Sequence, residues 1–373
     1  MSTNANQNTH PSIWQKGFAG LTILLALASI VVVALYGWAN AGPLVISFFV
    51  AIVLFLRSTK HFAGFAFTFL IFAAVAASLY YPNVFTHIGS FETKGLIVPL
   101  LMIIMFGMGT SMSVGDFAAV GKMPKGVFIG LLCQFTIMPI VGFALATVSG
   151  LPPEIAAGII LVGCSPSGLA SNVMAYISGA NLALSLTLTA VSTLLAPFIT
   201  PFYMSLLADE FVPIDAMAMF WSICKIVILP IIAGLIFNHL LHGKFSFIDK
   251  AMPKVSMLGI AIIITVITAA GRDSLLAIGG ILIVLVLIHN VIGYVCGYGS
   301  AKLLGMDESS SRTIAFEVGM QNSGLASGIA LEMGRVASMG LAPAVFGPLM
   351  NITGSSLAAW WRGKSVVNGK EQA

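Results

Sequence analysis

The sequence predicts an all-α polytopic membrane protein that is built from two inverted repeats of five helices. Three observations predict this fold class. The 373 residues are 58% hydrophobic and only 8% charged, whereas an ordinary soluble domain carries roughly a quarter charged residues. Apolar runs that approach the ~20 residues needed to cross the hydrocarbon core recur along the chain. A ten-residue motif in the first half of the chain returns, slightly changed, in the second half.

Twelve apolar runs, separated by polar residues or by glycine and proline, are candidate membrane-spanning helices. The alternation with a period of two that a transmembrane β-barrel requires does not occur in these runs. The run 43–57 is the shortest, and its length leaves open whether it crosses the whole bilayer. The predicted spans are 18–38, 43–57, 62–81, 95–112, 126–149, 154–177, 181–207, 215–240, 253–271, 274–303, 312–333 and 341–361.

The distribution of basic residues predicts the orientation of these spans, because Lys and Arg accumulate in cytoplasmic loops. If the N-terminus is cytoplasmic, thirteen of the seventeen basic residues lie on the cytoplasmic side. Lys94, Arg272 and Arg335 then lie outside, and Lys225 falls within a span. We therefore expect a multi-pass protein of the cytoplasmic (inner) membrane with an even number of spans and both termini in the cytoplasm.

The repeated motif predicts the domain organisation. "VGCSPSGLAS", residues 162–171, matches "VGMQNSGLAS", residues 318–327, at seven of ten positions. The same offset aligns span 126–149 with span 274–303. An odd number of spans in each half inverts the second half relative to the first, as in many secondary transporters. We expect an N-terminal extension with two candidate helices and a ten-helix transporter, which cover 1–61 and 62–373, with repeats at about 62–208 and 215–363.

Both copies of the motif lie near the middle of their spans, where they predict breaks in the helices. Each copy contains glycine with hydroxyl or amide side chains, and the first contains Pro166. Gly costs a helix interior ~1 kcal/mol and Pro ~3 kcal/mol. Broken backbone at membrane depth must face protein or a watery cavity. The freed carbonyls can ligate a cation, and the N-termini of the half-helices can hold an anion.

Glu317 is the one acidic residue that lies well inside a predicted span. A bare carboxylate there costs at least ~2.5 kcal/mol, so it must be paired, protonated or bound to an ion. A structural glutamate that is hydrogen-bonded to its neighbours is the alternative; the adjacent helix break favours an ion site. Na⁺ suits the surroundings because a hard cation prefers oxygen ligands. The oxygens available are those of Glu317, Gln321, Asn322, Ser171, Asn172, Ser185, Thr189 and Gln134.

Four segments resemble the sodium/bile acid symporter family, specifically its bacterial ten-helix branch. They are "GCSPSGLASNVMAYISGANLALSLTLTAVSTLLAPFITP", "IMFGMGTSM", "LIHNVIGY" and "EVGMQNSGLA". The resemblance extends from about residue 62 to residue 363. It implies a panel domain, made of the first, second, sixth and seventh of ten helices, that packs on a core domain made of the rest. In that core, two discontinuous helices cross beside two sodium ions.

The resemblance also implies which residues hold the two ions. One Na⁺ would be held by Ser171, Asn172, Ser185, Thr189 and Glu317. The second would be held by Gln134, Glu317, Gln321 and the backbone carbonyls of Val318 and Met320. Every side-chain ligand of the family pattern is present in this chain.

The substrate residues depart from the family pattern. Where bacterial members commonly read "WHN", this chain has Leu349-Met350-Asn351, and Leu169 stands where Thr is frequent. The resemblance implies an organic anion as substrate, which in the family ranges from bile acid-like steroids to small carboxylates such as pantoate and 2-keto acids. We expect import of a small carboxylate, with Asn322 as an amide donor at a half-helix N-terminus.

Other classes of function fit the sequence less well. An intramembrane hydrolase needs a nucleophile with a base, or two acids at membrane depth, and neither pattern is evident. A passive channel does not require an inverted repeat with one central acid. A proton-coupled carrier that uses Glu317 is the nearest alternative. We therefore expect a transporter and not an enzyme, whose partners are sodium, a small organic anion and the lipid bilayer. Nucleic acid is not expected, and the oligomeric state is open.

Overall fold

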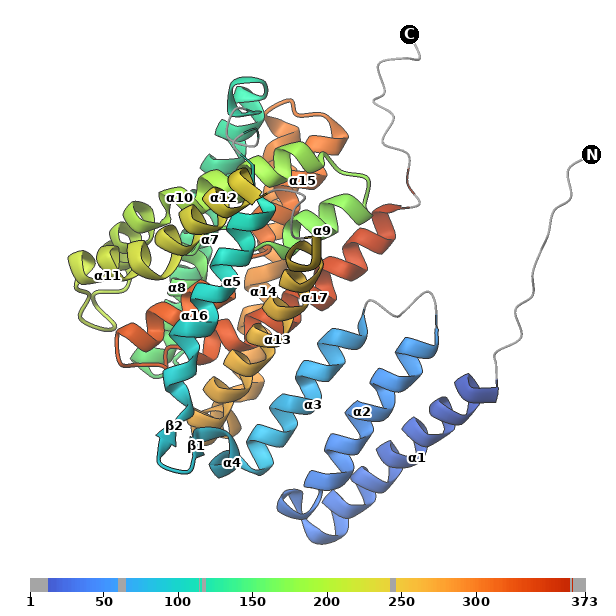
Figure 1. The fold of residues 1–373 in the computed structure, drawn as a ribbon. Helices are drawn as coiled ribbons and strands as arrows, with labels where there is room; N and C mark the ends of the chain where they lie inside the picture. Colours follow the sequence, from blue (N-terminus) through green and yellow to red (C-terminus); the bar gives the residue numbers. More distant parts are fainter. Residues whose placement is uncertain are drawn as a thin grey trace, which may run out of the picture. The chain divides into compact units, whose positions relative to one another are not determined.

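A computed structural model of the protein describes residues 13–59, 65–113, 115, 119–241, 246–362 and 364. This part of the chain is nearly all helix (Figure 1). Its one sheet is a short antiparallel hairpin of β1 (His87–Ile88) and β2 (Phe91–Glu92). The chain forms two compact units, Met1–Tyr81 and Pro82–Ala373.

The first unit is a row of three antiparallel apolar helices. Helix α1 packs on α2, and α2 packs on α3. The Trp38 ring, in the connection between α1 and α2, stacks on Tyr80 with the ring centroids 4.6 Å apart. Helix α3, which the repeat assigns to the ten-helix transporter, therefore packs against the N-terminal hairpin within this unit. The elements are α1 (Ile13–Tyr36), η1 (Trp38–Asn40), α2 (Gly42–Ser58) and α3 (Ala66–Tyr80).

The second unit contains the remaining helices. Six helical segments of the described chain are long and apolar enough to cross a membrane, and five of them lie in this unit. The helices are α4 (Pro82–Thr86), η3 (Thr93–Leu96), α5 (Ile97–Ser111), η4 (Ala119–Gly121), α7 (Pro124–Val148), α8 (Pro153–Cys164), α9 (Ala170–Ile177), α10 (Leu182–Leu207), α11 (Ala216–Ile223), the π-helical turn η5 (Cys224–Ile228), α12 (Leu229–Leu241), α13 (Ser246–Ala270), α14 (Arg272–Leu303), α15 (Glu308–Gly319), α16 (Ser323–Glu332) and α17 (Leu341–Arg362).

Two of the predicted spans are discontinuous, as the repeated motif predicts. Span 154–177 divides into α8 and α9, and span 312–333 divides into α15 and α16. The two unwound segments lie side by side: the Gly168 amide donates to the Met320 carbonyl (2.9 Å), and the Asn322 amide donates to the Pro166 carbonyl (2.8 Å). Each break therefore satisfies backbone groups of the other, which lipid could not do.

The two broken helices run in opposite directions, as inverted repeats require. Glu154, at the start of α8, bonds to Arg335, which follows the end of α16. Arg312, in the first turns of α15, donates to the carbonyl of Ser178, which follows the end of α9 (3.3 Å). Each broken helix thus begins where the other one ends.

The second unit contains the core domain and three panel helices. The core comprises α7–α10 and α14–α17, with α14 packed on α7, α15 and α17. The panel helices are α5, α11–α12 and α13, with α5 packed on α12 and α13. Helices α5 and α12 meet at Gly109 and Gly234, where an added Cβ would overlap the facing backbone carbonyl of the other helix. Small residues permit this kind of approach between membrane helices.

Candidate ion and substrate site at the helix crossing

Glu317 lies two residues before the end of α15, and its side chain is buried beside the break. Three hydroxyl groups from the first repeat reach its carboxylate. The Ser171 and Ser185 hydroxyls each donate to Oε1 at 2.6 Å. The Thr189 hydroxyl donates to Oε2 at 2.9 Å. An acid from one repeat is therefore surrounded by neutral oxygens from the other.

Asn172 completes this cluster. Its side-chain oxygen lies within hydrogen-bond distance of the Ser185 (2.8 Å) and Thr189 (3.3 Å) hydroxyls, each of which shares its single proton between Asn172 and Glu317. The local fold explains the arrangement: α9 begins directly after the break, so Ser171 and Asn172 lie in its first turn. Ser185 and Thr189 are four residues apart on α10 and share one face. All five residues predicted for the first Na⁺ thus meet at one place.

The cluster has the chemistry of a hard-cation site. Within the part of the chain that the structure describes, none of the ion pairs includes Glu317. Its carboxylate faces hydroxyls and an amide oxygen, not a basic side chain. A hydroxyl can turn its proton away and present a lone pair. Carboxylate, hydroxyl and amide oxygens are the ligands that a hard cation prefers.

The residues predicted for the second Na⁺ meet beside the first cluster. The carboxamides of Gln134, on α7, and Gln321 donate to each other at 2.8 and 3.2 Å. The Gln321 nitrogen also donates to the Val318 carbonyl at 2.6 Å. The Met320 carbonyl accepts the Gly168 amide, which occupies one of its two lone pairs. A cation here requires the Gln321 carboxamide to turn its oxygen toward Val318.

The four residues predicted to bind substrate are distributed around the crossing. Asn322 begins α16, and its side-chain oxygen accepts the Leu325 amide (3.0 Å), so its Nδ2 is the atom that can donate to an anion. Leu169 precedes α9. Met350 is buried on α17, and Asn351 uses its amide donor on the Gly347 carbonyl of its own helix (3.0 Å). The Asn351 side chain is therefore hydrogen-bonded within α17.

Other polar residues hold the breaks in place, and sequence reasoning did not single out two of them. The Ser167 hydroxyl donates to the backbone carbonyl of Glu317 at 3.1 Å. Asn290, on α14, donates to the Gly319 carbonyl (2.7 Å), and Thr353 donates to the oxygen of Asn290 (2.6 Å). The repeat offers a signal for Ser167, because it aligns with Ser323 at the second break. Thr353 has no comparable signal.

At the end of α15 away from the crossing, Glu308 forms a polar cluster with Lys302 and Arg312. Its carboxylate accepts from Lys302 Nζ (2.7 Å) and Arg312 Nε (2.8 Å), and also from the Tyr298 hydroxyl (2.7 Å). Burial acts to raise the pKa of Glu308, but these three hydrogen bonds outweigh it and lower that pKa to about 2. The cluster holds the Arg312 side chain in place, and Arg312 in turn donates to the carbonyl of Ser178, directly after the end of α9.

Several known proteins are similar to this chain in sequence. The profile of the Sodium Bile acid symporter family matches residues 98–278. A Bacillus subtilis (strain 168) protein named an uncharacterized sodium-dependent transporter, YocS, is 42% identical over 310 residues, which cover 83% of this chain and 94% of YocS. A probable chloroplastic sodium/metabolite cotransporter of Arabidopsis thaliana, BASS1, is 36% identical, over 70% of this chain and 65% of BASS1.

Among solved structures, the sodium proton antiporter MjNhaP1 from Methanocaldococcus jannaschii aligns with 95% of this chain and 98% of its own. The TM-score is 0.49 and the sequence identity is 11%. The sequence comparisons agree with the resemblance found in the crossover motifs. The chain belongs to the sodium bile acid symporter family, whose members are membrane transporters and not enzymes.

Proposed function

We propose that this protein imports a small organic carboxylate, of the pantoate or 2-keto acid kind, by coupling its movement to the entry of sodium. The observation that carries the proposal is the Glu317 carboxylate, which is enclosed by oxygens of Ser171, Ser185, Thr189 and Asn172. Relatives that are named sodium-dependent or sodium/metabolite transporters support sodium as the coupling ion.

In this mechanism, Na⁺ binds first. Glu317 supplies its charge and the first repeat supplies neutral oxygens, so a bound ion links α15 to α9 and α10. A second Na⁺ at Gln134 and Gln321 links α7 to the second break. Two cations around one carboxylate leave a net positive charge at the crossing. The anionic substrate, held near Asn322, then balances that charge and completes the site.

Alternating access follows from the same charge balance. A core with empty sites keeps a buried carboxylate without a counter-ion, and a core with Na⁺ alone has an excess of positive charge. Moving the fully loaded core past the panel helices exposes the least net charge to the hydrocarbon. The inward sodium gradient then drives import. We place the protein in the cytoplasmic membrane with both termini inside, because this orientation puts most basic residues in the cytoplasm.

The test is the thermal stability of the purified protein, titrated with NaCl against KCl at fixed ionic strength and pH. Sodium should raise Tm and potassium should not, because a ligand at a hundred times its Kd stabilises the native state by about 2.7 kcal/mol. Glu317→Gln should abolish the rise. Glu92→Gln, at an exposed acid on β2, is the matched control and should retain it.

Two results would contradict sodium coupling. Equal changes in Tm with NaCl and KCl would show that the protein has no sodium-selective site. Equal responses combined with a pH-dependent Tm that Glu317→Gln abolishes would instead assign Glu317 to proton coupling, the nearest alternative.

A further inference from the structure

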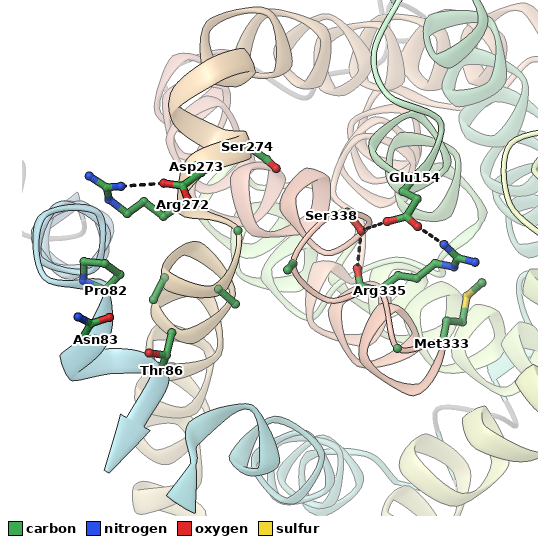
Figure 2. A pocket seen from close by; sticks show the side chains of 15 residues that line it. Pro82, Asn83, Thr86, Glu154, Arg272, Asp273, Ser274, Met333, Arg335 and Ser338 are labelled. Carbon is green, nitrogen blue, oxygen red and sulfur yellow. Dashed lines mark hydrogen bonds and ion pairs between the residues drawn. The ribbon is translucent and has the colours of Figure 1, made fainter. Parts of the chain in front are cut away.

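A cavity of about 860 Å³ lies between the panel helices and the core, away from the helix crossing. Figure 2 shows its lining: Asn83 and Thr86 from α4, Arg272 to Ser274 at the α13–α14 junction, and Glu154, Arg335 and Ser338 on the opposite side. We refer to it as the outer cavity, because it is lined by the segments that connect α13 to α14 and α16 to α17. The distribution of basic residues predicts that both segments lie outside the cell. Sites for small molecules typically have volumes of about 300–1,000 Å³.

Two donors in the outer cavity hold a carboxylate. Arg335 Nη1 donates to one oxygen of Glu154, and the Ser338 hydroxyl donates to the other (Figure 2). The Arg335 and Glu154 side chains are 30% and 41% exposed, so both remain accessible from the cavity. A guanidinium and a hydroxyl that donate hydrogen bonds to the two oxygens of one carboxylate form a carboxylate-recognition site. In this structure the carboxylate belongs to the protein itself.

The other arginine of the outer cavity has a different environment. Arg272 Nη1 bonds to Asp273 at 2.7 Å, and the Asp273 side chain is 91% exposed. Each arginine therefore has a carboxylate partner, and the four charges balance. An anion gains little from the net field of such a cavity. It can bind by exchange, in which its carboxylate replaces that of Glu154 on Arg335 and Ser338, and the Glu154 side chain rotates into the solvent.

We propose that the outer cavity is a first binding site for the organic carboxylate, with Arg335 and Ser338 as its donors and Glu154 as a built-in competitor. The inference rests on the proposed import of an organic anion and adds a second site, separate from the helix crossing. The exchange replaces one carboxylate by another on the same donors. Its cost is therefore that of a half-exposed ion pair, which is small.

The exchange has a structural consequence for transport. Glu154 lies in the first turn of α8, and Arg335 lies just after α16. Their ion pair ties the start of one broken helix to the end of the other on the outer side. A carboxylate that occupies Arg335 releases α8 from this tie. Binding in the outer cavity thereby loosens the crossed helices at the end through which the substrate enters.

The experiment measures occupancy of the cavity without requiring transport. Cys133, Cys164, Cys224 and Cys296 are replaced by alanine, and Ser274→Cys places one thiol in the cavity lining. The purified protein, in detergent, is modified with the anionic reagent MTSES at fixed ionic strength. Increasing pantoate should slow the modification of this thiol. The uncharged pantolactone, which lacks the carboxylate, should not.

Four variants in this background test the assignment of the donors. Glu154→Gln should lower the half-protecting pantoate concentration about two- to fivefold, the range that a half-exposed ion pair supports. Arg335→Gln should remove the protection, and Arg335→Lys should retain part of it. Arg272→Gln removes the same charge from the same cavity and should leave the protection unchanged.

Equal protection in Arg335→Gln and the parent, or equal protection by pantolactone, would overturn the proposal. The NaCl-dependent rise in Tm is measured for each variant as a check on folding. That measurement also separates the two proposals. Loss of pantoate protection with an intact sodium response rejects the outer cavity alone, whereas loss of the sodium response with intact protection rejects sodium coupling alone.

Discussion

The two broken helices share a backbone design and differ in chemistry. Both unwind at the repeated motif, and their unwound segments bond to each other across the crossing. The first break carries Pro166 and is followed by Ser171 and Asn172, which are proposed as neutral ligands. The second carries the acid Glu317 and the amide Gln321. Duplication thus preserved the geometry of the break, whereas the carboxylate lies in one repeat and the hydroxyls that contact it lie in the other.

This division means that neither repeat contains all the proposed ligands of either sodium ion. In the first cluster, one ligand comes from the second repeat and four come from the first. In the second cluster the balance is reversed, because Gln134 alone comes from the first repeat. Ion binding can therefore report whether the two repeats are correctly crossed.

The largest effect is expected from moving the charge between repeats. Glu317→Gln should weaken Na⁺ binding about a thousandfold, because a pair of unit charges 4 Å apart is worth about 4 kcal/mol at an effective dielectric of 20. Adding Asn172→Asp should restore part of the sodium-dependent rise in Tm, since Ser185 and Thr189 already contact that position. No restoration in the double variant would show that the carboxylate must come from the second repeat.

A single hydroxyl of the first repeat should have the next largest effect. Ser185→Ala removes a 2.6 Å hydrogen bond to Glu317. A hydrogen bond to a charged group contributes about 1.5–3 kcal/mol, so the Kd for Na⁺ should rise at least about tenfold in a Tm titration. Ser192→Ala is the control, because this buried hydroxyl on the same helix bonds to the Thr189 carbonyl. Equal losses in both variants would point to general destabilisation of α10.

The contact between the breaks can be disturbed without changing a ligand. A Cβ at Gly168 would lie 2.8 Å from the Gln321 carbonyl oxygen. Gly168→Ala should therefore destabilise the protein by about 1–3 kcal/mol and lower Tm in the absence of sodium. Gly324→Ala, whose Cβ would meet Leu101 at an ordinary 3.4 Å, should be neutral or slightly stabilising. A tolerated Gly168→Ala would show that the two breaks can separate.

The smallest effect is expected at Glu308, away from the crossing. Its pKa in the folded protein is about 2, below the ordinary value of about 4.3. The stability it contributes is therefore present above about pH 4.3 and is lost as pH falls toward 2. Glu308→Gln should lower stability by about 1 kcal/mol at pH 7. The difference in Tm from wild type should shrink progressively below pH 4.3, and a constant difference would contradict a charge effect.

The sequence predicts the helices and the breaks well, because both are local properties. Apolar runs and the Gly- and Pro-containing motif locate α8, α9, α15 and α16 without reference to the rest of the chain. The resemblance names the oxygens that meet at Glu317. The bonds between the breaks could not be predicted in this way, nor could the pairing of Glu154 with Arg335. They join residues roughly 150 to 180 positions apart, and no periodicity or spacing encodes such contacts.

The π-helical turn η5 and the hairpin of β1 and β2 were also not predicted. Pro230 lies two residues after the end of η5, and its ring conflicts with the carbonyl of Ile226, four residues earlier. A wider turn removes that conflict, so the proline is a signal that could have been read. The packing of α3 on α2 depends on which neighbour meets an apolar face, and hydropathy alone does not specify the neighbour.

The bonds between Gly168 and Met320 and between Asn322 and Pro166 also determine when, during synthesis of the chain, the crossing can form. The first break leaves the ribosome roughly 150 residues before its partner. At about 5–20 residues per second, that delay is on the order of 10–30 s. During this interval its open backbone groups have no partner, and lipid cannot supply one. The nascent first repeat must therefore be kept in a hydrated insertion site until the second repeat arrives, so the crossing is a late event in the biogenesis of this transporter.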